Sequence, residues 1–375
     1  MMTNGPGSRE EGFTLIELMI ALVLVSIIGL GITQFLVANA QTYKFLAGQS
    51  RVQESGRFAL ETLIRSAQMA GFKGCFSTND EVHKTFLADI PYEFDLTSPL
   101  MGYEGETTAW VPDIEAVLPK TVAAVDTNVY AAGAVGPGSG IDTDSILRKT
   151  DIFTVTYISE KKHRLSVNMP TSAEEVEVDT TDFEFANDYM AYIHDCEKGT
   201  IFRVTGIGAG GEIQHTGLLD PDGYTNALVR LAEFNTFETD AYVSAIVSHT
   251  FFVAPGEAAL NAGNTTMSLW RKVGPAAPEE LVEGIEDLQV KYGVDTDGDD
   301  VPNRYLDADA VIDFNDVLTL KITVTSNSVE DVGGNTGPTH GCTSAGGSQD
   351  CLPGETFDGL LRRAFTQTIN LKNRG

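Results

Sequence analysis

GFTLIEL, residues Gly12–Leu18, opens the segment that decides the fold, because a long apolar run follows it. No residue from Leu18 to Tyr43 carries a charge. A helix of this length would measure about 39 Å, which exceeds the hydrocarbon core of a bilayer. The run therefore predicts a membrane-spanning helix, with the carboxylate of Glu17 at its very start.

Beyond Gln41 the apolar residues fall on one stripe of a helix. They recur at three- and four-residue spacing: Val52, Gly56, Ala59, Leu60, Leu63, Ala67 and Ala70. No proline interrupts the pattern, so we expect one helix from Phe13 to Ala70, ended by the glycines of Gly71–Cys75. Its first half is apolar on all sides, and its second half is suited to pack on a sheet.

Charge is distributed unevenly along the 375 residues. Acidic and basic residues balance up to Ala70, so the net charge of −28 lies in residues 71–375. A strongly acidic head repels nucleic acid and anionic lipid, so we expect no nucleic-acid partner. The same acidity favours solubility and the binding of cations.

Beyond residue 150 the sequence alternates apolar and polar residues in short runs rich in β-branched and aromatic side chains. The predicted strands are Ile152–Ser159, Thr200–Ile207, Ala241–Val253, Met267–Val273, Leu288–Val294, Val317–Thr325 and Phe365–Leu371. The fold class is therefore α+β, with the amphipathic half of the helix packed on a mainly antiparallel sheet. We divide the chain into a leader (1–12), a long helix (13–70) and one acidic β-rich head (71–375).

No stretch of the sequence predicts an enzyme. Gly206–Gly211 contains G-x-G-x-x-G, but no helix pattern follows it, so we interpret it as a hairpin turn rather than a dinucleotide site. His194 and Cys196 lack the spacing of any known catalytic motif, and the other histidines show no metal-ligand spacing.

Four cysteines favour two disulfides. Cys342 and Cys351 bracket a loop rich in glycine and serine that allows them to meet, which leaves Cys75 to pair with Cys196. Disulfides suit an oxidising compartment such as the periplasm or the cell surface.

The Asp-rich loop, residues 295–303, is the strongest motif in the head. Carboxylates alternate at Asp295, Asp297 and Asp299, and the Val301 carbonyl and Asn303 follow at the spacing of an EF-hand loop. We expect a calcium site, although Asp300 stands where that loop has glycine and Leu306 where it has glutamate. Asp307 or Asp309 could complete the ligand set; the alternative is a solvated acidic turn.

Two interpretations of Glu17 follow from its position. It could lie in the headgroup region of an ordinary single-span anchor. However, glycine, an aromatic residue, glutamate and a charge-free helix in this order closely resemble the type IV prepilin signature. The resemblance implies cleavage after Gly12 by prepilin peptidase, N-methylation of Phe13, and a role for Glu17 in setting register during assembly. The leader departs from the family pattern, because Glu10 and Glu11 replace the usual basic residues before Gly12.

Three segments resemble PilW-type minor pilins: Ala70–Cys75, Leu281–Val294 running into the Asp-rich loop, and Leu361–Asn373. The resemblance implies a minor pilin that helps to start type IV pilus assembly at or near the filament tip. It would contact other minor pilins and the major pilin, and the head would pass from the periplasmic side of the inner membrane to the extracellular pilus. The alternatives are a minor pseudopilin of type II secretion and a pilus-mounted adhesin.

Mature protein isolated from envelopes should begin at Phe13, because the Gly12–Phe13 junction directly precedes the apolar helix. N-terminal mass spectrometry checks this, and Gly12→Val should leave the leader attached. Finding Met1 at the start of the assembled form would contradict the prepilin interpretation.

Overall fold

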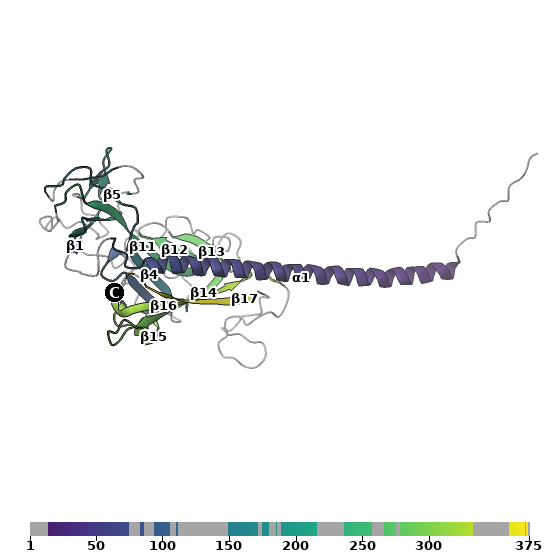
Figure 1. Cartoon of the computed structure of the whole chain (residues 1–375). Coiled ribbons are helices and arrows are strands. Elements are labelled where there is room, and N and C mark those ends of the chain that lie inside the picture. The colour runs from purple at the N-terminus through teal and green to yellow at the C-terminus, as the bar shows by residue number, and fades with distance from the viewer. Residues whose placement is uncertain are drawn as a thin grey trace, which may run out of the picture. The chain divides into compact units, whose positions relative to one another are not determined.

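The structure is a computed structural model of the chain, and Figure 1 shows its elements. It describes residues 14–74, 83–85, 94–105, 110–111, 149–171, 175–179, 185, 189–215, 236–256, 266–274, 278–332, 360–371 and 373. Five predicted site residues lie outside these ranges: Gly12, Phe13, Cys75, Cys342 and Cys351.

Helix α1 spans Leu15–Met69 as one uninterrupted element. Side chains from Thr14 to Leu46 are exposed all round, and the apolar window is long enough to cross a membrane. Val52, Ala59 and Leu63 are buried instead, on the stripe that the periodicity predicts. The predicted two-part helix is confirmed, and it ends one residue before the expected Ala70.

Two compact units divide the chain, and α1 passes from one to the other. The first comprises Met1–Arg51 and Glu330–Leu361, and the second comprises Val52–Val329 and Arg362–Gly375. Every described strand belongs to the second unit, together with the buried part of α1. The amphipathic half of the helix is therefore structurally part of the head.

A ten-stranded sheet is built around β11 (Tyr242–Pro255), the longest strand. Antiparallel partners of β11 are β7 (Met190–His194), β4 (Ile152–Ile158), β12 (Met267–Val273) and β5 (His163–Arg164). The sheet continues through β8 (Gly199–Arg203) to β1 (His83–Thr85), through β2 (Leu100–Gly105) to β3 (Trp110–Val111), and through β12 to β13 (Glu279–Glu283). Only the β1–β8 pair is parallel among these described strands.

Two smaller antiparallel sheets complete the head. One has the order β15 (Arg304–Leu306), β14 (Ile285–Val294), β16 (Val317–Asn327) and β17 (Arg362–Asn370). The other joins β6 (Val176–Glu177), β10 (Glu212–Gln214) and β9 (Gly206–Ile207). Because β9 and β10 pair across Gly208–Gly211, the predicted hairpin turn is confirmed.

The main core lies where the buried stripe of α1 meets residues of both larger sheets. Ala59, Leu63 and Ala67 belong to one apolar cluster with strand residues of β4, β11, β14 and β16. Gly56 permits close contact with β17, because a Cβ built there would lie 2.2 Å from the Phe365 ring. On the other sheet, the Ser66 hydroxyl lies 3.2 Å from Nδ1 of His249.

A second apolar cluster lies under β7, β8 and the three-stranded sheet. Its aromatic side chains are Phe185, Phe202 and Phe237, and it also buries Met169 and Ile213. It shares no residue with the main core. The second compact unit is therefore stabilised by separate apolar cores.

Asp151 joins the two larger sheets. Its carboxylate accepts hydrogen bonds from the Gly105 N–H in β2 (3.0 Å) and from the Val290 N–H in β14 (2.8 Å). Its own N–H donates to the Leu288 carbonyl at 2.8 Å. The side chain is only 2% exposed. Burial raises the pKa of the Asp151 carboxyl from 3.8 to about 7, against the effect of its two N–H donors.

This raised pKa predicts a pH-dependent stability. Between pH 4 and pH 7 the folded state binds more protons at Asp151 than the unfolded state, so the free energy of unfolding should fall as the pH rises. The change should be on the order of 4 kcal/mol. Melting curves of the full chain in detergent, compared with Asp151→Asn, measure it.

Asp151→Asn cannot titrate, so its melting temperature should depend less on pH over this range. The variant should also lose about 1–3 kcal/mol at pH 4, since its amide NH2 faces a backbone N–H donor. Parallel pH curves for the two proteins would contradict the assignment.

Candidate assembly and metal-binding sites

The start of α1 forms a capping box around Glu17. The Glu17 carboxylate accepts hydrogen bonds from the Thr14 N–H (3.2 Å) and from the Thr14 hydroxyl (3.1 Å). In return the Glu17 N–H donates to the Thr14 hydroxyl at 3.3 Å. These reciprocal bonds satisfy N–H groups that a helix leaves without intrahelical partners. The pattern Thr-x-x-Glu at Thr14–Glu17 signals this capping role, which was not among the roles predicted for Glu17.

Polar side chains within the apolar part of α1 bond back to their own helix. The hydroxyls of Ser26, Thr33 and Thr42 each donate to the carbonyl four residues earlier, at 2.7, 2.8 and 2.9 Å. This pattern satisfies each hydroxyl without water. Glu17 is therefore the one charged side chain of the helix between Leu15 and Tyr43.

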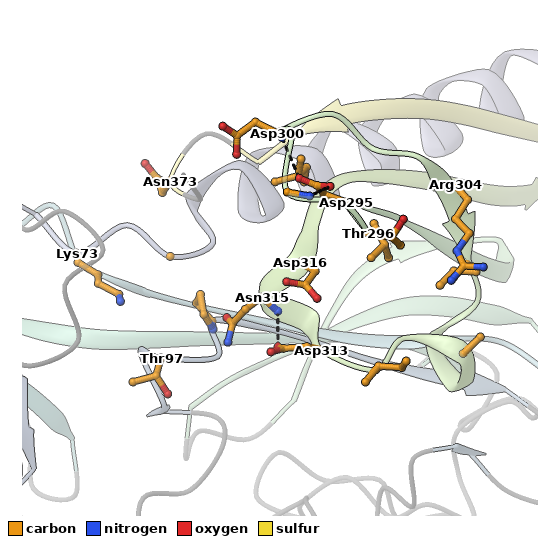
Figure 2. A pocket seen from close by; sticks show the side chains of 18 residues that line it. Lys73, Thr97, Asp295, Thr296, Asp300, Arg304, Asp313, Asn315, Asp316 and Asn373 are labelled. Atoms are coloured by element: carbon orange, nitrogen blue, oxygen red, sulfur yellow. Dashed lines mark hydrogen bonds between the residues drawn. The ribbon is translucent and has the colours of Figure 1, made fainter.

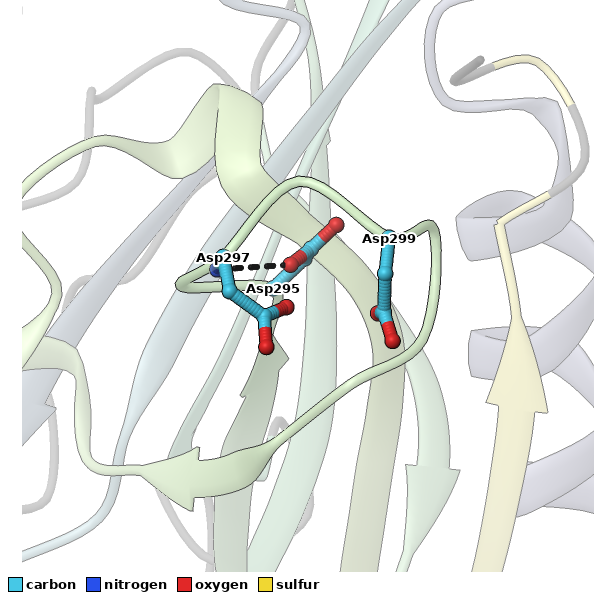
Figure 3. Close-up of side chains that lie close together, drawn as sticks. All are labelled: Asp295, Asp297 and Asp299. Atoms are coloured by element: carbon cyan, nitrogen blue, oxygen red, sulfur yellow. Dashed lines mark hydrogen bonds between the residues drawn. The ribbon is translucent and has the colours of Figure 1, made fainter.

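The Asp-rich loop, between β14 and β15, brings three predicted ligands together (Figure 3). Carboxylate oxygens of Asp295, Asp297 and Asp299 lie within 4.8 Å of one another. Asp300 has φ of 61°, so the left-handed conformation usual for glycine is present at this position despite the aspartate.

Asp295 organises the loop from within. Its carboxylate accepts hydrogen bonds from the N–H groups of Asp297 (3.0 Å), Gly298 (2.8 Å) and Asp300 (2.9 Å). Desolvation alone would raise the pKa of this carboxyl, but the backbone hydrogen bonds from Gly298, Asp297 and Asp300 together outweigh it and hold the pKa below its ordinary value. The Asp295 carboxylate is therefore held in its charged form, the form that would bind a cation.

The other expected ligands have different roles in the described loop. Asn303 closes the loop, because its Oδ1 accepts from the Thr296 N–H (2.6 Å) and its amide donates to Asp297 (3.2 Å). The Val301 N–H donates to Asp299 at 3.0 Å. Asp307 pairs with Lys291 at 2.5 Å, and Asp309 lies exposed on a 3₁₀ turn, Ala308–Ala310.

Cys196 is the one cysteine within the described residues. It has φ of 69° and is not a free thiol. The partner of Cys196 is not among the described residues, so both Cys75–Cys196 and Cys342–Cys351 remain predictions.

The N-terminal segment defines the class of protein. Residues 7–33 match the prokaryotic N-terminal methylation motif, and they include Gly12, Phe13 and Glu17. A methylation motif that runs into a long apolar helix makes this chain a pilin-type protein with a prepilin signature.

The C-terminal third narrows the class to a family. Residues 250–373 match the family described as type IV pilus-assembly protein W, PilW, so the expected resemblance to a PilW-type minor pilin is confirmed. The match includes Leu281–Val294 and Leu361–Asn373 but not Ala70–Cys75. No curated protein and no solved structure matches the chain.

Peptide mapping without reduction should recover Cys75 linked to Cys196 and Cys342 linked to Cys351. In the chain-entropy model, closing the short loop between Cys342 and Cys351 contributes about 2–3 kcal/mol. Mass spectrometry of alkylated, proteolysed full chain checks both links. Free thiols in envelope-derived protein, or crossed pairing, would contradict them.

Proposed function

We propose that this chain is a minor pilin that takes part in starting type IV pilus assembly, at or near the filament tip. The observation that carries the proposal is the pair of matches at the two ends of one chain, the methylation motif at residues 7–33 and PilW at 250–373. The second match favours a pilus over a secretion pseudopilus. Prepilin peptidase, the major pilin and other minor pilins are the proposed partners.

The apolar half of α1 supports a role in assembly. Its exposed side chains, from Leu15 at 77% to Tyr43 at 75%, can be buried only by lipid or by helices of other subunits. Before assembly the same surface suits the inner membrane, with the head proposed to lie in the periplasm. After assembly it would lie among neighbouring pilin helices, with the head on the outside of the filament.

Glu17 would then have two separable roles. Within its own chain it caps the helix through Thr14. Between chains, its charge would pair with the Phe13 amine of a neighbour, because a carboxylate among apolar helices persists only when it is paired. Glutamine can accept the capping hydrogen bond as well as glutamate can, but it carries no charge.

Glu17→Gln should therefore insert and be cleaved normally but fail to enter filaments. We expect its recovery in sheared filaments to fall at least about tenfold, since leaving a buried charge without its partner costs about 3–5 kcal/mol. Immunoblots of sheared filaments and of envelopes measure the ratio.

Thr14→Val provides the matched control, because it removes the capping hydroxyl and keeps the charge of Glu17. Its recovery should remain within about twofold of wild type, as an N-cap contributes about 1 kcal/mol. If Glu17→Gln assembles normally and Thr14→Val does not, capping rather than charge pairing is the function of Glu17.

We also propose that the Asp-rich loop binds calcium through Asp295, Asp297 and Asp299. Three carboxylates within 4.8 Å of one another repel each other, and a hard divalent cation offsets that repulsion. A bound ion would tie the end of β14 to the start of β15, which pair through Val294 and Arg304.

Calcium should raise the melting temperature of the full chain in detergent, and chelation should lower it. The stabilisation is about 2.7 kcal/mol when free calcium is a hundredfold above the dissociation constant. Asp297→Ala should abolish the response, whereas Asp240→Ala, an exposed aspartate outside the loop, should keep it. A response that sodium reproduces at equal ionic strength would show a solvated acidic turn.

A further inference from the structure

A cavity of about 720 Å³ opens in the head beside the Asp-rich loop (Figure 2). Its walls come from segments distant in sequence: Gly71 and Lys73 after α1, Thr97 and Pro99 before β2, residues 294–318, and Asn373. Ten of its side chains are polar or charged, namely those labelled in Figure 2. Of the three proposed calcium ligands only Asp295 lines the cavity, so the calcium site does not account for it.

The walls are anchored rather than loosely placed. The Asn373 amide donates to the carbonyls of Gln68 (3.2 Å) and Ala70 (3.4 Å), which fixes the C-terminal segment to the end of α1. Gly71 has φ of 76°, and a Cβ there would lie 3.2 Å from both Asn373 and Pro99. A glycine at this position lets the walls meet, so the cavity is a built feature of the fold.

Two acidic groups of the lining are already engaged in holding the structure. Asp295 accepts three backbone hydrogen bonds within its loop. Asp313 accepts from the Asn315 N–H at 2.8 Å, where it caps the 3₁₀ turn Phe314–Asp316. These two carboxylates hold the backbone of the walls in place, so they do not indicate which ligand the cavity could bind.

The carboxylates of Asp300 and Asp316 differ, because within the described residues neither accepts a hydrogen bond nor forms an ion pair. Figure 2 shows Asp316 in the middle of the view, between Arg304 on one side and Lys73 on the other. Four aspartates against Lys73 and Arg304 leave the lining net acidic. The cavity therefore favours a cationic group.

One apolar side chain that lines the cavity is almost fully exposed to solvent. Ile312 lines the cavity and is 99% exposed. Val301 and Tyr305, on the neighbouring loop and strand, are 55% and 43% exposed. Exposed apolar side chains beside uncommitted charges are typical of a surface that a partner protein covers.

We propose that this cavity binds a segment of another protein that carries a lysine or arginine next to an apolar residue. The basic group would pair with Asp300 and Asp316, and the apolar residue would cover Ile312. A small molecule suits the cavity less, since such ligands prefer mainly apolar, enclosed pockets. The identity of the partner as another filament subunit rests on the proposed pilin function. The chemistry of binding at the cavity is argued from the lining residues and does not depend on that function.

Site-specific photocrosslinking of the full chain in filament-assembling cells tests the proposal. The photoreactive residue p-benzoylphenylalanine replaces Ile312, or Val167 as an exposed control outside the cavity. We expect a cross-link from position 312 to a peptide with a lysine or arginine close to the attachment point. Asp300→Asn combined with Asp316→Asn should lower its yield roughly fivefold or more, because these charges steer association.

The control combination Glu160→Gln with Asp240→Asn removes two exposed charges elsewhere and should leave the yield unchanged. If the double variant melts at a lower temperature than wild type, the single variants Asp300→Asn and Asp316→Asn are used in its place. A cross-link to a basic segment of a protein that is not part of the filament would support the proposed binding at the cavity. The same result would count against the proposed pilin function. No cross-link above the Val167 level, a peptide without a basic residue, or equal loss in both combinations would overturn the proposal.

Discussion

The head depends on one stripe of a helix that is buried against two sheets at once. Ala59, Leu63 and Ala67 are fully buried, and their small or medium size lets α1 approach the strands closely. Gly56 extends this close approach to β17. The same helix continues toward its N-terminus with exposed apolar side chains on every face, so its buried stripe anchors one end of a long apolar surface.

Asp151 adds a polar constraint to this apolar packing. A single buried carboxylate receives one N–H from each of the two larger sheets, so it sets how β2 and β14 meet. Buried hydrogen-bonded charge specifies an arrangement more than it stabilises one, since burial opposes ionisation. This junction lies next to β14, the strand that leads directly into the Asp-rich loop.

Both proposed head sites therefore lie at one end of the same strand. The Asp-rich loop starts where β14 ends, and the cavity uses Val294, Asp295 and Asp300 from this region. Asp300 belongs to both features, since its N–H helps to hold the loop and its carboxylate lines the cavity. A cation bound by the loop and a partner bound in the cavity would consequently act on neighbouring groups.

The sequence by itself determined the helix, the longest of the described strands and the three clustered aspartates, because each is encoded by local spacing. Several shorter strands were not predicted, among them β2, β7 and β13, since their identity depends on partners distant in sequence. The tertiary structure alone decided that Asp151 joins two sheets, that Asn303 closes its loop, and that Asp316 and Lys73 line one cavity. The physical reason is that burial and pairing between distant segments arise only when the sheets pack around the helix.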